Sequence, residues 1–419
     1  MIQDTDKTRK ITVLGAGIVG LCCAVSLQWD GRSVTLVDRL DPGTGTSFGN
    51  AGLIQIDAVV PIATPGILRA VPKMLLDPKG PLVVRWRYLH RIAPWLAAFV
   101  RAAHPNSVER ISIALASLLD LSNDAWLSLV EDANAQDVWR QSGELHVYRK
   151  KEAWEAAQPT HDLRRRRGSK LEDLTVDEMR QLEPALSHDL YRGVFTPNAN
   201  SITHPLHLSQ HLFDLFRRNG GDFVKTNVRE ILTGDDGEPS SLNTDNGAID
   251  VRELVIAAGA FSKPFTAAAG SKVPLDTERG YHLWLPDPGV EMRRPVVVGD
   301  HRFGIVPMTG GVRLVGTAEF AGLELPPYWE RADVLADLAG PFVPGLNLEG
   351  AERWMGYRPS LPDSLPVIGR PPGRKNVYLA FGHGHLGLTM AGITGKIVAD
   401  LAAGRDPAVD LLPFRVDRF

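Results

Sequence analysis

The N-terminal part of the chain alternates short apolar runs with a helical pattern of small side chains. Residues 11–14 and 33–37 are apolar and rich in β-branched side chains, as buried strands are. Between them, glycines in residues 15–20 precede small and apolar side chains at helical spacing over residues 21–28. This order predicts a β-α-β unit, in which a helix covers two parallel strands.

The pattern changes in the middle of the chain. Residues 61–110 contain helical pieces broken by prolines and interspersed with aromatic side chains, which we interpret as an insertion. A longer amphipathic helix is predicted over residues 111–135, a strand over 144–148 and helices over 151–183. The basic run at residues 164–167 is interpreted as a solvated helix face.

The second half of the chain returns to alternating helices and strands. Alternating apolar and polar positions within residues 272–350 predict an antiparallel sheet. The other predicted elements are a helix over residues 205–219, strands over 223–228, 253–257 and 377–380, and a helix from about Gly387. The predicted fold class is α/β (α+β overall), with a Rossmann-like domain interleaved with an antiparallel-sheet domain.

The composition is that of a globular enzyme. Hydrophobic residues make up 44% and charged residues 23% of the 419 residues, and the formal charge is −3. Nucleic acid is therefore not expected as a partner, because no basic field exists to hold a phosphate backbone. Cys22 and Cys23 are adjacent, so no ordinary disulfide is expected between them. The polar N-terminus lacks a signal-peptide pattern, and we expect a cytoplasmic protein.

A glycine-rich turn joins the first predicted strand to the first helix. Residues 15–20 read GAGIVG, which fits the G-x-G-x-x-G fingerprint of dinucleotide binding in the required strand-turn-helix context. The glycines permit the tight turn, the approach of a pyrophosphate and close packing of helix on strand. The predicted cofactor contacts in this turn are Gly15, Gly17, Ile18, Val19 and Gly20.

An acidic residue ends the second predicted strand. Asp38 lies about 20 residues after the fingerprint, where a carboxylate accepts hydrogen bonds from ribose hydroxyls. It disfavours the 2′-phosphate of NADP, so FAD and NAD remain. The fingerprint alone does not separate these two, but its N-terminal position beside a large interleaved domain favours FAD. Arg39 is a further candidate contact.

Several motifs in register resemble one known family. They are ITVLGAGIVG at residues 11–20, VTLVD at 34–38, TSFGNAG at 46–52, AGA at 258–260, RGY at 279–281, GYRP at 356–359, PDSLPVIG at 362–369 and GHGHLG at 382–387. Together they resemble the FAD-dependent D-amino acid oxidase superfamily, and within it the bacterial D-amino acid dehydrogenases. The resemblance extends over nearly the whole chain, although residues 61–135 match in style more than in motif.

The resemblance implies a division of the chain. The FAD-binding domain would be discontinuous, comprising residues 1–58, 190–271 and 351–419. The substrate-binding domain, with its helical insertion, would comprise residues 59–189 and 272–350. This division agrees with a length that favours two to three domains.

The resemblance also assigns further cofactor contacts. The loop over residues 43–52 is rich in glycine, serine and threonine, so its backbone can curl around phosphate or flavin. It contains no His or Cys, so we expect non-covalent FAD. The implied contacts are Ser47, Asn50, Ala51 and Gly52 in this loop, Val228 near the adenine, Ala258, Gly259 and Gly356, and Gly384, His385, Leu386, Gly387 and Thr389 at the C-terminal glycine turn.

The C-terminal glycine turn has a chemical reason to face the flavin. A helix N-terminus offers unpaired N–H groups, which stabilise the negative charge of reduced flavin. His383 and His385 could form a metal pair, but without Cys or acidic partners we expect no metal.

A substrate carboxylate is expected to meet Arg358. Only the planar guanidinium of arginine gives a permanently charged bidentate partner, and Arg358 resembles the carboxylate-binding arginine of the family. Tyr281 and His282 are further candidates from the predicted antiparallel sheet. Thr317 and Glu319 are secondary candidates to line the substrate site.

The resemblance implies oxidative deamination. Hydride would pass from the α-carbon of a D-amino acid to flavin N5, and water would hydrolyse the imino acid to a 2-oxo acid and ammonia. Catalysis would depend on placing the C–H bond of the α-carbon near flavin N5 and on desolvating the site, and no strong base would be needed. The expected electron acceptor is a quinone or another component of the respiratory chain.

Two other functions stay open. One is oxidation of a secondary amine such as D-proline, hydroxyproline or an N-methyl amino acid. The other is a structural flavin-binding subunit of a larger complex, which Arg358 argues against because a structural flavin needs no carboxylate clamp.

The insertion also suggests a surface role. Arg85, Arg87, Arg91 and Arg101 interleave with Trp86, Leu89, Trp95, Leu96 and Phe99. This pattern suits peripheral contact with an anionic bilayer at the inner face of the cytoplasmic membrane. An ordinary amphipathic surface or a contact in a homo-oligomer would give the same pattern.

Overall fold

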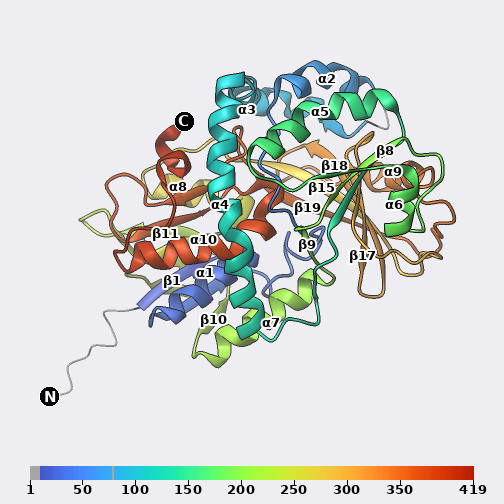
Figure 1. The fold of residues 1–419 in the computed structure, drawn as a ribbon. Coiled ribbons are helices and arrows are strands. Elements are labelled where there is room, and N and C mark those ends of the chain that lie inside the picture. Colours follow the sequence, from blue (N-terminus) through green and yellow to red (C-terminus); the bar gives the residue numbers. More distant parts are fainter. Residues whose placement is uncertain (1–9, 78–79) are drawn as a thin grey trace.

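The first β-α-β unit forms the centre of a parallel sheet on one side of the molecule (Figure 1). The computed structural model describes residues 10–77 and 80–419. The central strand β1 (Lys10–Leu14) pairs in parallel with β2 (Ser33–Asp38) and with β14 (Leu254–Ile256). The parallel sheet is completed by β10 (Asp222–Lys225) beside β2, and by β21 (Val377–Phe381) and the antiparallel β20 (Val367–Gly369) beyond β14.

Two helices with small side chains pack tightly beside this sheet. They are α1 (Ile18–Trp29) and α10 (Gly387–Ala402), and they contact each other along their length. A Cβ atom at Gly395 would lie 2.5 Å from the carbonyl oxygen of Cys22, so this close approach requires glycine. A further helix, α7 (Pro205–Arg218), packs on α1.

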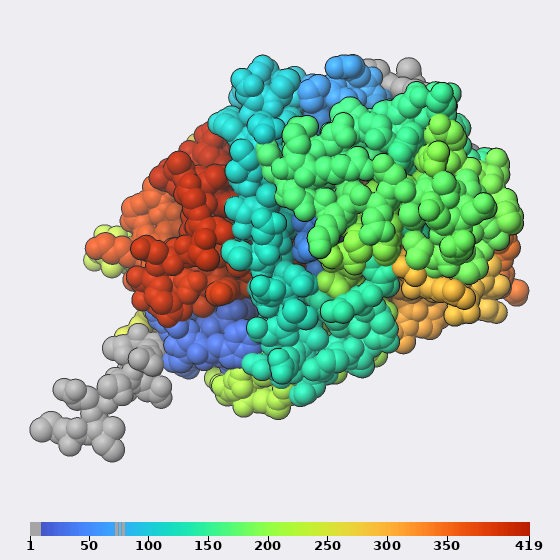
Figure 2. Space-filling view, in the orientation of Figure 1, coloured from blue at the N-terminus to red at the C-terminus, as the bar shows by residue number. Residues whose placement is uncertain are grey.

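The longest described helix, α4 (Pro105–Asp132), packs on α10. The indole nitrogen of Trp126 donates to the carbonyl oxygens of Leu388 and Thr389 at 2.9 and 3.1 Å. By length and composition alone α4 could cross a membrane, but half of its most apolar stretch is buried inside the protein. Figure 2 shows α4 in cyan between the C-terminal part in red and the middle of the chain in green.

A second, mainly antiparallel sheet forms the other half of the molecule (Figure 1). Its strands lie in the order β19 (Glu352–Ser360), β15 (Asp276–Leu285), β18 (Gly311–Phe320), β17 (Phe303–Met308), β16 (Val296–Val298), β6 (Glu144–Tyr148), β8 (Arg192–Thr196) and β7 (Glu172–Leu174), and β4 (Leu82–Val84) pairs with β18. The β16–β6 and β18–β4 pairs are parallel. The predicted α/β class is confirmed, with strands of mixed orientation.

Shorter elements surround the two sheets. The helices are α2 (Pro65–Leu76), α3 (Leu89–Ala102), α5 (Lys151–Arg166), α6 (Val176–Leu182), α8 (Ser262–Ala268) and α9 (Glu330–Ala339). Single 3₁₀ turns are η2 (Trp86–Tyr88), η3 (Gly259–Phe261), η4 (Gly384–Leu386), η5 (Leu412–Phe414) and η6 (Val416–Arg418). Two small sheets consist of β11 (Val228–Thr233), β12 (Pro239–Thr244) and β13 (Gly247–Asp250), and of β3 (Leu53–Ile54), β9 (Asn200–Ile202) and β5 (Trp139–Arg140).

The structure corrects some boundaries expected from the sequence. The strand predicted over 223–228 is divided, because β10 ends at Lys225 and Val228 begins β11. The strands β8 and β19 belong to the second sheet, and both lie in segments that the predicted division gives to the FAD-binding domain. The domain bounds stay a prediction. The predicted antiparallel region contains a helix, α9, that alternation did not indicate.

The basic run at residues 164–167 is only partly a solvated face. Arg164 is 6% exposed, and its guanidinium donates to the carbonyl oxygen of Asp57 at 3.1 Å and to the hydroxyl of Thr196 at 3.2 Å. The interpretation of Arg164 as solvated was therefore wrong, since a charge run does not show which member points inward. Arg166 remains exposed and lies 3.9 Å from Glu109.

Candidate active site

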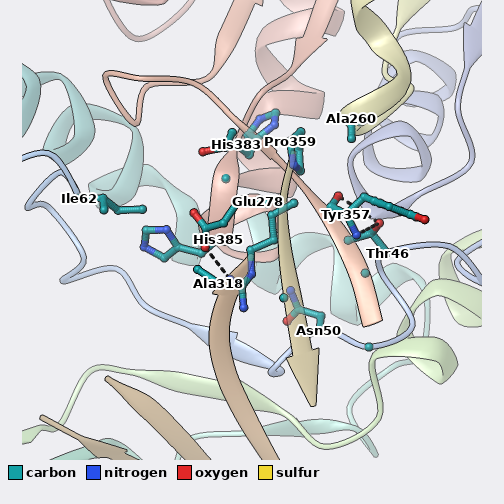
Figure 3. Close-up of a pocket in the computed structure, with 18 of the residues that line it drawn as sticks. Thr46, Asn50, Ile62, Ala260, Glu278, Ala318, Tyr357, Pro359, His383 and His385 are labelled. Carbon is teal, nitrogen blue, oxygen red and sulfur yellow. Dashed lines mark hydrogen bonds and ion pairs between the residues drawn. The ribbon is translucent and has the colours of Figure 1, made fainter. Parts of the chain in front are cut away.

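One cavity of about 1690 Å³ is lined by both large sheets and by the glycine-rich loops (Figure 3). Sites for drug-sized ligands typically measure about 300–1,000 Å³. The cavity therefore has room for a dinucleotide together with a small substrate. Its lining includes residues of the fingerprint turn, the 45–51 loop, β15, β18, β19 and the C-terminal glycine turn.

The fingerprint turn is shaped by two positions at which a side chain would collide with backbone. Gly15 has a φ of +112°, and a Cβ there would lie 2.4 Å from the carbonyl oxygen of Ala257. A Cβ at Gly20 would lie 1.8 Å from the carbonyl oxygen of Gly15. The turn therefore holds the start of α1 against the ends of β1 and β14, where helix N-terminal N–H groups favour anions.

The carboxylate of Asp38 helps to hold this turn. One oxygen accepts from the amide of Ala16 at 2.6 Å and the other from the amide of Leu40 at 2.9 Å. Asp38 also lines the cavity, where each oxygen keeps a second lone pair for a ligand hydroxyl. Arg39 lies beside it with its guanidinium 4.1 Å from the ring centre of Phe261.

The loop over residues 43–52 is fixed at several points. Its Ser47 hydroxyl accepts from the amide of Ile18 at 2.9 Å, which connects the loop to the N-terminus of α1. The Thr46 hydroxyl bonds to both the amide and the carbonyl of Tyr357 at 3.2 Å. The Asn50 side chain accepts from the amide of Gly52 at 2.7 Å. A cofactor in the cavity would therefore meet an ordered loop.

A buried arginine supports the same loop from the second sheet. Arg313 on β18 donates to the carbonyl oxygen of Asn50 at 2.6 Å, and burial lowers the pKa of its guanidinium to about 10. The guanidinium is therefore still charged at neutral pH.

The C-terminal glycine turn contributes to the cavity through only some of its predicted contacts. Gly384, which has a φ of +55°, His385 and Gly387 line the cavity. The side chain of Leu386 is buried in the hydrophobic core. The Thr389 hydroxyl accepts from the amide of Gln55 at 3.1 Å and donates to the carbonyl oxygen of Leu53 at 3.3 Å.

Burial lowers the pKa of both histidines of this turn. His383 is 2% exposed and its Nε2 lies 3.0 Å from the Thr394 hydroxyl. Burial lowers the pKa of His383 to about 3. Burial is also the largest cause that lowers the pKa of His385, where the charge of Glu278 opposes the shift and the charge of Arg358 adds to it. Within residues 10–77 and 80–419, no group of three His, Cys, Asp or Glu side chains is arranged to hold a metal ion.

Arg358 lies in the cavity on β19 and pairs with an acidic side chain. Its guanidinium lies 2.6 Å from the Glu278 carboxylate on β15 and 3.4 Å from the carbonyl oxygen of Thr317. A Cβ at Gly280 would lie 2.3 Å from Arg358. Gly280 faces Gly356 across the two strands. The Arg358 guanidinium occupies the space above Gly280, and the indole of Trp354 occupies the space above Gly356.

The two other predicted catalytic residues have partners within the protein. The Tyr281 hydroxyl donates to Glu319 at 2.5 Å and accepts from the amide of Tyr328 at 3.0 Å, although Tyr281 also lines the cavity. His282 lies outside the cavity lining: its Nδ1 is 3.2 Å from the carbonyl oxygen of Gly49, and its ring stacks on Trp354. Burial, followed by the charge of Arg313, lowers the pKa of His282 to about 3.

The two secondary candidates also differ in position. Thr317 lines the cavity from a bulge in β18, with a φ of +51° that is unusual for a β-branched residue. Glu319 is fully buried, 3.5 Å from Arg279. Glu319 therefore supports the second sheet and does not line the cavity.

The cavity brings together most of the residues that the sequence indicated. Those that line it are Gly15, Gly17, Ile18, Val19, Asp38, Arg39, Ser47, Asn50, Ala51, Val228, Ala258, Gly259, Tyr281, Gly356, Arg358, Gly384, His385 and Gly387. Those outside the lining are Gly20, Gly52, His282, Leu386 and Thr389. Their positions suit a structural role, since they shape or support the loops that do line it.

Sequence reasoning missed Glu278. It immediately precedes the RGY motif at residues 279–281, and the alternation along β15 places it on the same face of the strand as Gly280. That alternation was the available signal, but only the pairing of β15 with β19 shows that Glu278 faces Arg358.

The chain matches one family model over residues 10–401, described as "FAD dependent oxidoreductase" of the DAO family. It belongs to this family of FAD-dependent oxidoreductases. The turn over residues 15–20, here called the glycine cradle, and the Asp38 carboxylate fit a dinucleotide. Side chains at Gly15 and Gly20 would collide with backbone and prevent the turn from forming.

Full-length relatives carry names in amino acid oxidation. The chain is 34% identical to a D-amino-acid oxidase of Bradyrhizobium diazoefficiens and 32% identical to a D-amino acid dehydrogenase of Paramagnetospirillum magneticum, each covering 98% of this chain and 99% of the relative. These similarities agree with an enzyme that acts on amino acids.

Solved structures share the fold. Glycine oxidase from Geobacillus kaustophilus has a TM-score of 0.77 at 20% identity, covering 98% of this chain and 99% of the other. L-proline dehydrogenase from P. horikoshii has a TM-score of 0.74 at 19% identity, covering 98% and 97%. At this identity the likeness shows the architecture alone.

Replacing Asp38 with alanine is expected to weaken FAD binding. The change removes two hydrogen bonds that backbone amides donate to the carboxylate and that shape the turn, each worth about 1.5–3 kcal/mol, so we expect the dissociation constant to rise at least about tenfold. Flavin absorbance after dialysis measures the retained FAD. Asp189→Ala, which removes an exposed carboxylate from the second half of the molecule, is the control. Full FAD occupancy of Asp38→Ala after extensive dialysis would contradict this role.

Proposed function

We propose that the protein oxidises D-amino acids to 2-oxo acids and ammonia with non-covalently bound FAD. The observation that carries this proposal is Arg358, a guanidinium in the same cavity as the glycine cradle. The names of the full-length relatives support the D-amino acid class. The 43–52 loop offers no His or Cys for a covalent bond to the flavin, which supports non-covalent binding.

The residues of the cavity have separate tasks in this proposal. Bound FAD supplies the acceptor for the hydride that leaves the α-carbon of the substrate. Arg358 binds the substrate carboxylate through its planar donors and thereby fixes the α-carbon. Gly280 leaves room for the guanidinium itself, because a Cβ there would collide with it. Burial lowers the pKa of His385, which disfavours a second positive charge near the substrate.

The proposed electron acceptor is an apolar quinone, reached while the protein rests on an anionic membrane. The cavity lining extends from the flavin loops to apolar side chains of α2 and α3, including Met74 and Val100. Trp86 is 82% exposed, Leu89 48% and Val100 56%. Arg87, Arg91 and Arg101, which lie close to them in the sequence, are exposed and suit anionic lipid.

The insertion is less exposed than its sequence pattern suggested. Trp95 is 6% exposed, packs against Phe320 and donates its indole N–H to the carbonyl oxygen of Ser360 at 3.3 Å. Phe99 stacks on Trp95 at 5.2 Å. The face available to a membrane therefore consists of Trp86, Leu89 and Val100 and their basic neighbours.

The decisive experiment is an anaerobic absorption spectrum of the purified protein. D-alanine is expected to bleach the oxidised flavin band, because electrons from the substrate enter the flavin. L-alanine should leave the band unchanged. Bleaching by D-proline alone would instead favour the secondary-amine function. A flavin that neither D-amino acid bleaches would contradict the proposal.

Replacing Arg358 with alanine tests the carboxylate clamp. Because hydrogen bonds to charged groups contribute about 1.5–3 kcal/mol, we expect kcat/KM for D-alanine to fall about 10- to 150-fold, mainly through KM. FAD content should not change. Arg353→Ala, which removes an exposed arginine of the same strand, is the matched control. Unchanged kinetics in Arg358→Ala would show that the carboxylate binds elsewhere.

Liposome flotation tests membrane attachment. The protein is expected to float with vesicles containing anionic lipid, less with neutral vesicles, and less again after Trp86→Glu, which places a charge on the apolar face. Leu412→Glu, at a residue 64% exposed elsewhere, is the control. Protein that stays wholly in the soluble fraction, or a Trp86 face buried in a dimer by size-exclusion chromatography, would count against attachment.

A further inference from the structure

The cavity contains an acidic side chain whose role is not covered by the proposed chemistry. Glu278 lies directly opposite Arg358 in the register of β15 and β19, and its carboxylate is 2.6 Å from the guanidinium. The side chains of Glu278 and Arg358 are 14% and 25% exposed. Figure 3 shows Glu278 next to His385, with Ala318 and Ile62 around them.

This ion pair differs from the surface pairs of the molecule. On the same strand β19, Arg353 pairs with Asp333 at the same distance of 2.6 Å, but those side chains are 51% and 44% exposed. Exposed pairs contribute about 0–1 kcal/mol, because water screens both charges. The pair of Glu278 and Arg358 lies in the wall of the cavity, where less water is available to screen either charge.

A carboxylate beside the substrate-binding arginine weakens the binding of simple anions. An anion that binds Arg358 must share the guanidinium with Glu278 or displace it, and the two negative charges then repel each other. A zwitterion brings its own positive charge, which can lie against Glu278 while its carboxylate lies against Arg358. Each charge of the zwitterion then lies against an opposite charge of the protein.

The neighbouring carboxylate on β15, that of Asp276, already has a partner within the protein. Asp276, two residues earlier on the same face of β15, accepts from the Tyr88 hydroxyl at 3.0 and 2.9 Å through its two oxygens. Both oxygens of the Asp276 carboxylate therefore lie within hydrogen-bond distance of the Tyr88 hydroxyl. Glu278 is the carboxylate of β15 that both lines the cavity and contacts Arg358.

We propose that Glu278 receives the α-ammonium of the substrate and makes the site selective for zwitterionic amino acids over plain carboxylate anions. This inference rests on the proposed amino acid oxidation. It also concerns the product, because the 2-oxo acid carries a carboxylate without an ammonium group. Glu278 would therefore disfavour the product in the site from which it must leave.

The test compares two ligands that differ only in the amine. The amino acid 2-aminoisobutyrate has no hydrogen on its α-carbon and cannot donate hydride, and isobutyrate is the same molecule without the ammonium group. Both can be titrated into the FAD-loaded protein, with changes in the flavin absorption band as the signal. This measurement reports binding without turnover.

The expected results are as follows for four proteins. The wild-type protein binds 2-aminoisobutyrate at least about tenfold more tightly than isobutyrate, and Glu278→Gln reduces that ratio at least about tenfold, partly by tightening isobutyrate. Glu278→Asp, which keeps the charge, retains most of the preference. Asp333→Asn, which removes the acidic partner of the exposed Arg353, leaves the ratio unchanged.

Two results would overturn the inference. One is an equal or tighter binding of isobutyrate by the wild-type protein, which needs no variant to fold. The other is an unchanged ratio in a Glu278→Gln protein that retains FAD. The proposed function fails separately, if D-alanine does not reduce the flavin of a wild-type protein that still shows the ligand preference.

Discussion

The contact on which the site depends is the close approach of backbone to backbone where Gly15 meets Ala257. A Cβ at Gly15 would lie 2.4 Å from the Ala257 carbonyl oxygen. The loops that follow β1 and β14 can therefore lie this close together only because residue 15 is glycine. In parallel sheets, ligands bind at the carboxyl ends of the strands. The ends of β1, β2 and β14 therefore place residues near 15, 38 and 257 around one cavity.

The second sheet provides the charges that this cavity needs. Arg313 on β18 holds the 43–52 loop through the carbonyl oxygen of Asn50. Arg358 on β19 is presented between Glu278 and the glycine pair formed by Gly280 and Gly356. The two sheets therefore contribute different residues to the cavity. The parallel sheet contributes the glycine turn, and the second sheet contributes charged side chains.

Local motifs were the most reliable guides from the sequence. The turn over residues 15–20 lies between β1 and α1, and Asp38 ends β2, as the sequence predicted, because these positions depend on a short strand-turn-helix segment. Their contacts with a cofactor stay a prediction. The path of the chain at Val228, the burial of Arg164 and helix α9 were not predicted, because distant contacts decide them. Likewise, the hydroxyl of Tyr281 meets Glu319, which no local pattern indicates.

The sequence by itself determined the family, the α/β class and the glycine turn between β1 and α1, since these follow from residue types at fixed short spacings. Only the tertiary structure decided which of the candidate side chains line the cavity and which support its loops. It also decided that Glu278 faces Arg358 across β15 and β19. Strand pairing joins residues far apart in the chain, and a pairing register is set by the packing of the whole sheet, so no local spacing encodes this ion pair.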